Sequence, residues 1–558
     1  MTQREERRAL RRALRALSAA PPPRRVGWET APAPGLCLPR LLPGALPSHP
    51  PVAIGFGDAP ERRRLGAILE TIRERTLWWP AVRADAAAPE TLIDLAEAAD
   101  PAALVTAAPR GAVALTGGRE TARRAAAEAG LEAADSAAWI SPRRLRRVLG
   151  PAGGATAHWA ALGGIEAEAA GAPADPLRWL ARARWLDPWR GEETAAAEAL
   201  AALAVLREAA QRNDRPVVTL GLSAWKRRNA APFLEGPCGP ATHRARPGPA
   251  ARAAAKRGAR LAIWGARPAP PEAAGLETLR LEDGFVRSVG LGLRHAPPAS
   301  LAVDALALYF DATRETDFER LAREAAFPPA LLARAGALRR RLVALRITKY
   351  NVGGAAALPE TRRRRLLVPG QVEGDASLRF GSPSIRSNAE LLRAARARNP
   401  DAFLLYKPHP DVLTGLREGA VDAATLAEAA DAAAPDASAE ACLDWADEVE
   451  TMTSLMGFEA LLRGKPVAVH GRPFYHGWGL TAAAGTPFDR GRRLSLDALA
   501  AAALILYPRY VDPGTGLPAT PERVLDWLHE ERAFVRTRRG RLREGWRHMV
   551  SRVLNVVR

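Results

Sequence analysis

Cysteine is scarce in this chain of 558 residues, with only three, at Cys37, Cys238 and Cys442. They lie far apart, and no two of them have the spacing of a zinc-binding pair. An odd number of scattered cysteines fits a reducing compartment and argues against a disulfide framework. We therefore expect a cytoplasmic protein whose fold depends on its apolar core.

Long apolar runs are also missing. No stretch of eighteen or more apolar residues occurs, and the best candidate, at 498–507, is too short to cross a bilayer and is interpreted as a buried helix. The first residues, MTQREERRALRRALRAL, carry charges where a secretory signal would have an apolar centre. Two interpretations stay open for them: a basic helix lying on an anionic membrane surface, or a solvated terminus.

Lysine is rare as well, with five among 80 basic residues, although the net charge is +19. Arginine and alanine are abundant throughout, which indicates a bias of composition as much as a function. The sequence has no zinc finger, no RNP-like strand and no aromatic residues interleaved with basic ones. We therefore expect no nucleic-acid partner, because an acidic substrate, a lipid headgroup or composition alone explains the charge. A basic nucleic-acid binder is kept as a minor alternative.

Short apolar runs alternate with helical stretches from about residue 51 onward, which predicts an α/β fold with parallel sheets. We expect a Pro- and Arg-rich tail and linker over 1–50, and a diverged, shortened α/β module over 51–212. Two Rossmann-like domains should follow, over 213–360 and 361–495, facing each other across a cleft. A helical tail over 496–558 completes the predicted organisation.

Two short segments of the chain resemble each other. RWLDPWRG at 184–191 and RYVDPGTG at 509–516 share the arginine, the aromatic residue, the Asp-Pro pair and the final glycine. Each lies at the end of one half of the chain. This pattern suggests a tandem duplication in which the first copy is shorter and more diverged.

Two segments carry groups suited to a phosphate. KPHPDV ends an apolar run and places Lys407 and His409 at the carboxyl end of a predicted strand, where α/β sheets bind ligands. In TMTSLMGFEALLRGKPV, Thr453 or Ser454 begins a helix whose free N–H groups form an anion site. Glu459, about a turn and a half further on, could reach ribose hydroxyls. The ordinary alternatives are a solvated histidine and a simple capped helix.

Two other segments carry acids after predicted strands. LEDGFVRSVGLG places Glu282 and Asp283 before a glycine turn, with Arg287 as a candidate ion-pair partner. PGQVEGDAS places Gln371 and Asp375 in a loop. Carboxylates in these positions could serve glycosyl transfer as nucleophile or general acid/base. Structural roles, in an ion pair and in a turn, are the alternatives.

Six motifs occur in this order: EDGFVRSVGLG, ITKYNVG, VPGQVEGDAS, YKPHPDV, TMTSLMGFEALLRGKPV and PFYHGWGLT. The series resembles the capsule polysaccharide biosynthesis family and, within it, the β-Kdo transferases. The likeness is dense over 215–525 and faint over 40–195. It implies a GT-B-like pair of Rossmann-like domains, with 213–360 on the acceptor side and 361–495 binding a CMP-sugar.

The resemblance also implies an activity: retaining transfer of β-Kdo from CMP-Kdo to a lipid-linked glycan acceptor. It implies a peripheral place at the inner face of the bacterial inner membrane, with the capsule assembly or export machinery as partner. By resemblance, Asp375 is the predicted nucleophile and Glu282 the acid/base group, with Asp283 as second choice. The predicted substrate-binding residues are Lys407, His409, Thr453, Ser454, Glu459, Gln371 and Arg287. Arg287 is the candidate for binding the sugar carboxylate. No acidic metal-binding cluster is evident in the sequence, so we expect neither a cofactor nor a catalytic metal.

The first half of the chain departs from the two-module pattern of this family. It contains no counterpart of EDGF, KPHP or TMTSL. We therefore expect it to be inactive, so that the protein adds one type of linkage or needs a partner for another. Two alternatives remain: a non-catalytic scaffold for capsule export or assembly, and a related transferase that uses another nucleotide sugar.

Overall fold

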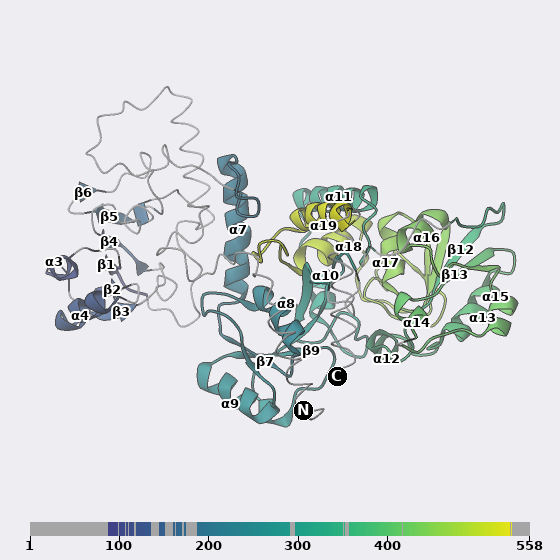
Figure 1. The fold of residues 1–558 in the computed structure, drawn as a ribbon, viewed down its shortest axis with the longest axis horizontal. Coiled ribbons are helices and arrows are strands. Elements are labelled where there is room, and N and C mark those ends of the chain that lie inside the picture. The colour runs from purple at the N-terminus through teal and green to yellow at the C-terminus, as the bar shows by residue number, and fades with distance from the viewer. Residues whose placement is uncertain are drawn as a thin grey trace, which may run out of the picture.

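The computed structural model describes residues 88–537 apart from gaps, the longest of which are 135–143, 151–159, 174–186, 291–295 and 352–356. The predictions for the tail over 1–50, its basic helix and the end of the chain beyond 537 lie outside the described residues. Three six-stranded sheets follow one another along the long axis of the molecule (Figure 1). In the described part of the chain, no helix has the length and apolarity needed to cross a membrane.

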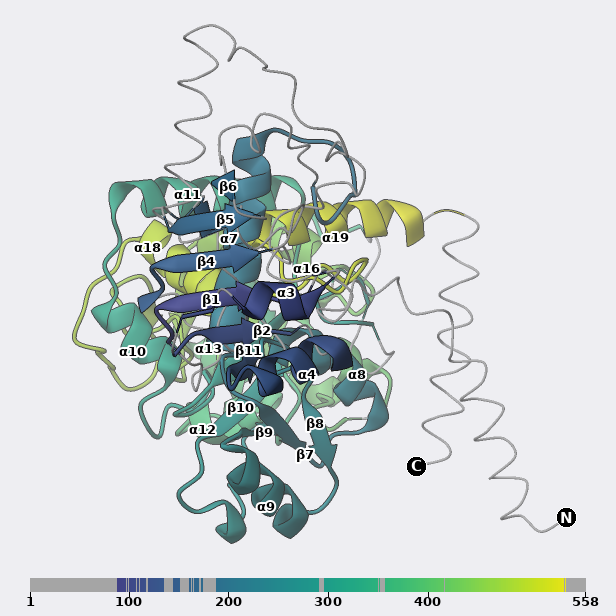
Figure 2. The ribbon, with the colours of Figure 1, turned by 90° about the vertical axis from the view of Figure 1, so that its left-hand side faces the viewer.

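The first sheet has the strand order β3-β2-β1-β4-β5-β6 and is parallel except for its last pair. Its strands are β1 (Thr91–Asp94), β2 (Val113–Leu115), β3 (Glu132–Ala134), β4 (Arg147–Gly150), β5 (Glu166–Ala169) and β6 (Ala172–Pro173). Helices α3 (Pro101–Val105) and α4 (Glu120–Glu128) lie beside it (Figure 2). The long helix α7 (Ala196–Arg212) lies between it and the second sheet (Figure 1). This is the α/β module predicted for the first half.

The second sheet has the order β18-β11-β10-β9-β7-β8. Its strands are β7 (Val217–Leu220), β8 (Thr242–Arg244), β9 (Arg260–Trp264), β10 (Thr278–Asp283), β11 (Ser300–Asp304) and β18 (Arg509–Tyr510). The strands β7 to β10 are parallel, whereas β11 and β18 pair antiparallel. Helices α8 (Ala224–Leu234) and α9 (Pro247–Arg257) make the connections between β7, β8 and β9.

The third sheet is fully parallel and has the order β14-β13-β12-β15-β16-β17. Its strands are β12 (Arg365–Pro369), β13 (Phe403–Lys407), β14 (Ala432–Ala433), β15 (Glu448–Thr451), β16 (Val467–Val469) and β17 (Ala482–Ala483). The helices around it are α12 (Ala376–Gly381), α13 (Asn388–Arg398), α14 (Pro410–Leu413), α15 (Ala423–Ala429), α16 (Ala439–Trp445) and α17 (Leu455–Leu462). The central strands are short apolar runs because helices cover both of their faces.

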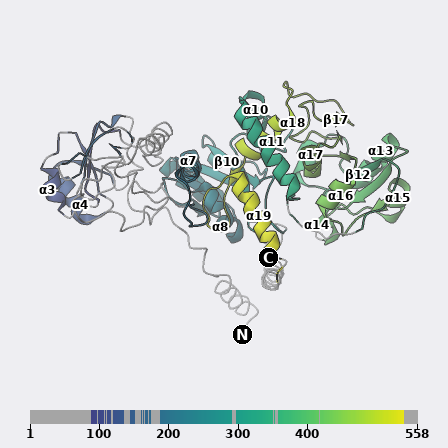
Figure 3. The same ribbon diagram turned by 90° about the horizontal axis from the view of Figure 1, so that it is seen from above.

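Helices between the second and third sheets join them into one unit (Figure 3). These are α10 (Asp317–Glu324), α11 (Pro329–Ala344), α18 (Leu496–Ala501), a π-helix (Ala502–Leu506) and α19 (Pro521–Val535). One apolar core runs through them, and in it Phe285 of the second sheet's domain stacks on Phe474 of the third at 4.3 Å. The pair of sheets confirms the predicted GT-B-like, Rossmann-like architecture.

The predicted helical tail over 496–558 needs a correction. Its segment Arg509–Tyr510 is strand β18, which pairs with β11 and so belongs to the second sheet. Two residues are too few to show the alternating pattern of a strand in the sequence. Arg509 and Tyr510 form a strand only because they pair with β11. The chain therefore returns from the third sheet to the second before it ends in α19.

The two Asp-Pro segments fold into loops with the same hydrogen bonds. Asp187 Oδ1 accepts the N–H groups of the residues two and three positions on, and Asp512 Oδ1 does the same. In both loops the backbone N–H of the aspartate donates to the carbonyl five residues on. The loops also contact each other, since Trp189 Nε1 donates to the carbonyl of Pro518 at 3.0 Å. This shared geometry supports the predicted duplication.

Candidate functional site

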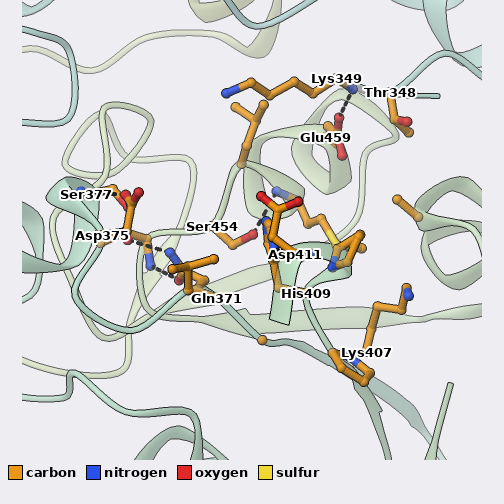
Figure 4. A pocket seen from close by; sticks show the side chains of 18 of the residues that line it. Thr348, Lys349, Gln371, Asp375, Ser377, Lys407, His409, Asp411, Ser454 and Glu459 are labelled. Carbon is orange, nitrogen blue, oxygen red and sulfur yellow. Dashed lines mark hydrogen bonds between the residues drawn. The ribbon is translucent and has the colours of Figure 1, made fainter. Parts of the chain in front are cut away.

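A cavity of about 540 Å³ lies between the second and third sheets. In the third sheet the strand order reverses between β12 and β15, and the crevice beyond that point is where parallel sheets bind ligands. The cavity opens there and extends to the carboxyl end of β10. Every predicted site residue except Arg287 lines it: Glu282, Asp283, Gln371, Asp375, Lys407, His409, Thr453, Ser454 and Glu459. Figure 4 shows six of these residues: Gln371, Asp375, Lys407, His409, Ser454 and Glu459.

A pair of hydrogen bonds joins the two loops at the point where the strand order reverses. The amide Nε2 of Gln371 donates to Thr453 Oγ1 at 3.0 Å, and the backbone N–H of Thr453 donates to Gln371 Oε1 at 2.9 Å. Gln371 is itself held by Asn388, whose Oδ1 accepts its backbone N–H at 2.8 Å. Gln371 therefore ties the loop after β12 to the loop after β15, and both loops line the cavity.

Basic and hydroxyl groups gather on one side of the cavity. Lys407, the last residue of β13, is buried and donates through Nζ to the carbonyl of Pro435 at 2.9 Å, and burial lowers its pKa. His409 begins α14, and its Nδ1 accepts the backbone N–H of Asp411 at 3.1 Å. Burial also lowers the pKa of His409, so near pH 7 the ring is neutral with its proton on Nε2. That N–H can donate to a ligand oxygen.

Ser454 is the N-cap of α17, and its Oγ accepts the backbone N–H of Met456 at 3.3 Å. The N-terminus of this helix, from Ser454 to Met456, lines the cavity, and the positive end of the helix dipole favours an anion there. Glu459 lies further along α17, where its Oε1 accepts the backbone N–H of Lys349 at 2.8 Å. Burial raises the pKa of Glu459 to about 7, against the charge of Arg463. Helix, hydroxyl and carboxylate thus meet on one wall.

The acid pair at the end of β10 enters the cavity from the other sheet. Burial, and then the neighbouring charge of Asp283, raise the pKa of Glu282 to about 7, against the charges of Lys349 and Lys226. Asp283 instead forms an ion pair with Arg287, 2.6 Å from its Nε. The two adjacent carboxylates therefore differ in their surroundings: Asp283 has Arg287 as its ion-pair partner, whereas the raised pKa of Glu282 lets Glu282 exchange a proton near pH 7.

Arg287 is not placed as the substrate-binding prediction requires. Its side chain is 1% exposed and does not line the cavity. Besides Asp283, its Nη1 donates to Ser288 Oγ and to the carbonyl of Ala296. The ordinary ion-pair alternative describes it better, because a half-buried carboxylate such as Asp283 needs a compensating charge.

Asp375 lies in the loop after β12, where it lines the cavity and is exposed. It is the N-cap of the short helix α12, and its Oδ1 accepts both the backbone N–H and the hydroxyl of Ser377, at 2.9 and 2.7 Å. These bonds use one carboxylate oxygen and fix the orientation of the group. Neither bond uses Oδ2, so this oxygen is the one that could meet a reacting carbon.

Lys349 lies in the motif ITKYNVG, for which the sequence predicts no site residue. The structure places Thr348 and Lys349 in the lining, and the charge of Lys349 acts on the pKa of both Glu282 and His409. Asn351 shapes this loop at a φ of 52°, with its Oδ1 accepting the backbone N–H of Thr348 at 3.0 Å. The signal that could have found Lys349 was its rarity among the basic residues. Within the residues described, no group of three His, Cys, Asp or Glu side chains could hold a metal ion.

A two-sheet α/β fold with an interdomain cavity of this kind is typical of a GT-B-like protein. Residues 329–510 match the profile of the family described as "Capsule polysaccharide biosynthesis protein". Over this segment the chain resembles the capsule polysaccharide biosynthesis family, as the motif series predicted.

Two curated relatives are similar in sequence. "Capsule polysaccharide modification protein LipA" of Neisseria meningitidis is 39% identical over 367 residues, which are 65% of this chain and 52% of that protein. "Lipopolysaccharide-processing protein LpsZ" of Rhizobium meliloti is 43% identical over 261 residues, 46% of this chain and 59% of that protein. The chain thus spans just over half the length of the curated relatives it matches.

Two solved structures from Thermosulfurimonas dismutans are also similar. "KpsC, beta Kdo 2,7 transferase" is 35% identical with a TM-score of 0.47, over 57% of this chain and 99% of that one. "KpsC, beta Kdo 2,4 transferase" is 32% identical with a TM-score of 0.49, over 56% of this chain and 98% of that one.

Proposed function

We propose that this chain is a retaining β-Kdo transferase of capsule assembly, which uses CMP-Kdo as donor and a lipid-linked glycan as acceptor. One observation carries the proposal: residues from all six motifs, in the domains of two different sheets, line the same cavity of about 540 Å³. The lining combines phosphate-binding groups with two carboxylates from opposite walls. A scaffold without chemistry does not require the two carboxylates.

The donor is held on the side of the third sheet. The protonated Nε2 of His409, the ammonium group of Lys407 and the helix start at Ser454 bind the CMP phosphate and stabilise it as a leaving group. Glu459 accepts hydrogen bonds from the ribose hydroxyls. Thr453 and Gln371 keep the two loops of this wall at the right separation, as their paired hydrogen bonds indicate.

Transfer proceeds in two displacements at the anomeric carbon. In the first, Asp375 Oδ2 forms a bond to that carbon while the bond to the phosphate oxygen breaks, and CMP leaves with the electron pair. In the second, the acceptor hydroxyl oxygen bonds to the same carbon and the bond to Asp375 breaks. Glu282 takes the hydroxyl proton in this step, which requires its ionised form.

The remaining parts of the proposal concern the setting. We place the protein at the inner face of the inner membrane, beside the capsule assembly or export machinery, because the acceptor is lipid-linked. No catalytic metal or cofactor is assigned, since His409, Lys407 and the α17 terminus supply the positive groups facing the phosphate. The first sheet contributes no described residue to the cavity lining, so we assign it no catalytic role.

The proposal is tested by incubating the full chain with CMP-Kdo, generated in situ, and a synthetic Kdo-terminated lipid-like acceptor, with products read by mass spectrometry. One added Kdo is expected, and Asp375→Ala should lower turnover by about a thousandfold or more while CMP still binds. Asp401→Ala, an exposed aspartate remote from the cavity, is the matched control. Intact turnover in Asp375→Ala would remove the nucleophile assignment, and transfer only from another nucleotide sugar would replace the donor.

A further inference from the structure

A second cavity, of about 280 Å³, lies in the domain of the second sheet, between α8 and the strands β7 and β8. Its lining consists of three alanines and four polar side chains: Thr219, Arg227, Arg228 and His243. None of the described residues that line it is acidic. This second cavity is therefore positively charged and separate from the donor cavity. It lies in the domain of the second sheet, whereas the proposed donor-binding residues lie in the domain of the third sheet.

The positive charges converge on the imidazole of His243. Burial lowers the pKa of this histidine, and the charges of Arg227 and Arg244 lower it further. Thr219 Oγ1 lies 3.1 Å from His243 Nδ1 and orients the ring. The guanidinium groups of Arg227 and Arg228 are exposed beside it on the first turns of α8. A carboxylate or phosphate in this cavity would meet planar, two-pronged donors together with an imidazole.

The neighbouring side chain connects this cavity to the acid pair. Lys226 lies next to Arg227 on α8, and its Nζ is 4.1 Å from the centre of the Trp264 ring. Trp264 ends β9 and is paired in the sheet with Leu281, the residue before Glu282. The charge of Lys226 acts on the pKa of Glu282. Basic groups of α8 thus extend from the edge of the donor cavity, at Glu282, to the second cavity.

We propose that the cavity of Arg227, Arg228 and His243 binds an anionic group of the acceptor, either a sugar carboxylate or a lipid phosphate. Held there, the acceptor presents its hydroxyl toward Glu282 along the edge occupied by Lys226. This inference rests on the transferase function proposed above and adds the site of the second substrate. The proposed donor-binding residues lie in the domain of the third sheet, whereas this cavity supplies charged groups in the domain of the second sheet.

The kinetic test is the double variant Arg227→Gln/Arg228→Gln in the full chain. The KM for the Kdo-terminated acceptor should rise about tenfold or more, because two charge-assisted hydrogen-bonding groups are lost, while the donor KM changes less than about twofold. Arg124→Gln/Arg144→Gln, two exposed arginines of the first sheet's domain, changes the net charge equally and should leave both constants unchanged. Equal effects of the two double variants would overturn the inference. His243→Gln provides a second variant with the same expected signature.

A binding test without turnover separates this inference from the proposed function. Kdo methyl glycoside supplies the carboxylate and glycerol 3-phosphate supplies the phosphate, each titrated into the full chain by isothermal calorimetry. The probe whose binding weakens in Arg227→Gln/Arg228→Gln identifies the source of the anion. If neither probe binds, or both bind the double variant as well as the unchanged chain, the inference is wrong. Probe binding at these arginines without any Kdo transfer would instead retain the site and remove the proposed function.

Discussion

Burial and a neighbouring charge both act on the pKa of Glu282. Burial and the charge of Asp283 both favour its neutral form, and together they raise its pKa to about 7. The proposed second displacement needs the ionised form, which accepts the acceptor's proton. Near neutral pH, a small change of pH therefore changes the fraction of Glu282 that is ionised and able to act as a base.

The resulting prediction concerns the pH profile of transfer. Since the ionised fraction of Glu282 grows as pH rises through about 7, kcat/KM for the acceptor should rise about tenfold per pH unit below this value and level off above about pH 8. Initial rates measured from about pH 5.5 to 9 check this. Glu282→Gln should lose most activity together with the pH limb.

Glu459 has a similarly raised pKa and provides the control for that experiment. It is assigned to the ribose rather than to proton transfer. Glu459→Gln should therefore weaken CMP binding yet keep the rise of rate with pH. A limb that disappears in Glu459→Gln and persists in Glu282→Gln would reverse the two assignments.

At the scale of elements, the two Asp-Pro loops have equal backbone geometry but unequal surroundings. Asp512 is fully buried and its Oδ2 also pairs with Arg523 Nε at 2.8 Å. Asp187, in the first loop, is only partly buried. Asparagine can still accept the loop's N–H groups at either position, so it tests the carboxylate charge alone.

Asp512→Asn is predicted to lower the free energy of unfolding by about 3 kcal/mol, because it leaves the mostly buried guanidinium of Arg523 with a neutral neighbour. Asp187→Asn should cost about 1 kcal/mol or less. Urea denaturation of both variants measures the difference. Equal losses would show that the loop geometry, and not the ion pair, determines the stability.

The sequence predicts elements well where local pattern and tertiary role agree. Apolar runs ending in polar residues correctly predicted the strand ends at Asp283 and Lys407, because the strands are apolar and the polar groups of the cavity begin at their carboxyl ends. Strand β18 could not be predicted, since its two residues are a strand only through pairing with β11. Arg287 could not be placed because the choice between ligand and ion pair depends on where the Asp283 carboxylate turns.

The candidate site shows the same limit. The motif order indicated which loops would meet, and the structure brings them to one cavity. Lys349 escaped prediction because it follows no strand. It reaches the cavity through a loop whose shape depends on Asn351 and on the backbone contact with Glu459. Whether the roles assigned to the lining residues are right stays a prediction that the transfer assay must decide.

For the whole molecule, the cavity makes ligand binding a contact shared by two sheets. CMP should therefore stabilise the second and third sheets together: at a free concentration about 100 times its Kd, it should raise the free energy of unfolding by about 2.7 kcal/mol. Calorimetric melting with and without CMP measures this. His409→Gln should reduce the shift, and an unchanged melting profile for the parent chain would argue against nucleotide binding in this cavity.

The contact between the two Asp-Pro loops has a consequence for synthesis on the ribosome. The hydrogen bond from Trp189 to Pro518 joins residues 329 positions apart. At about 5–20 residues per second, Trp189 emerges roughly 15–65 s before its partner exists. Throughout that interval an indole that is half-covered in the finished protein stays open to solvent. The nascent first copy must therefore persist, without its closing contact, until Pro518 has been synthesised.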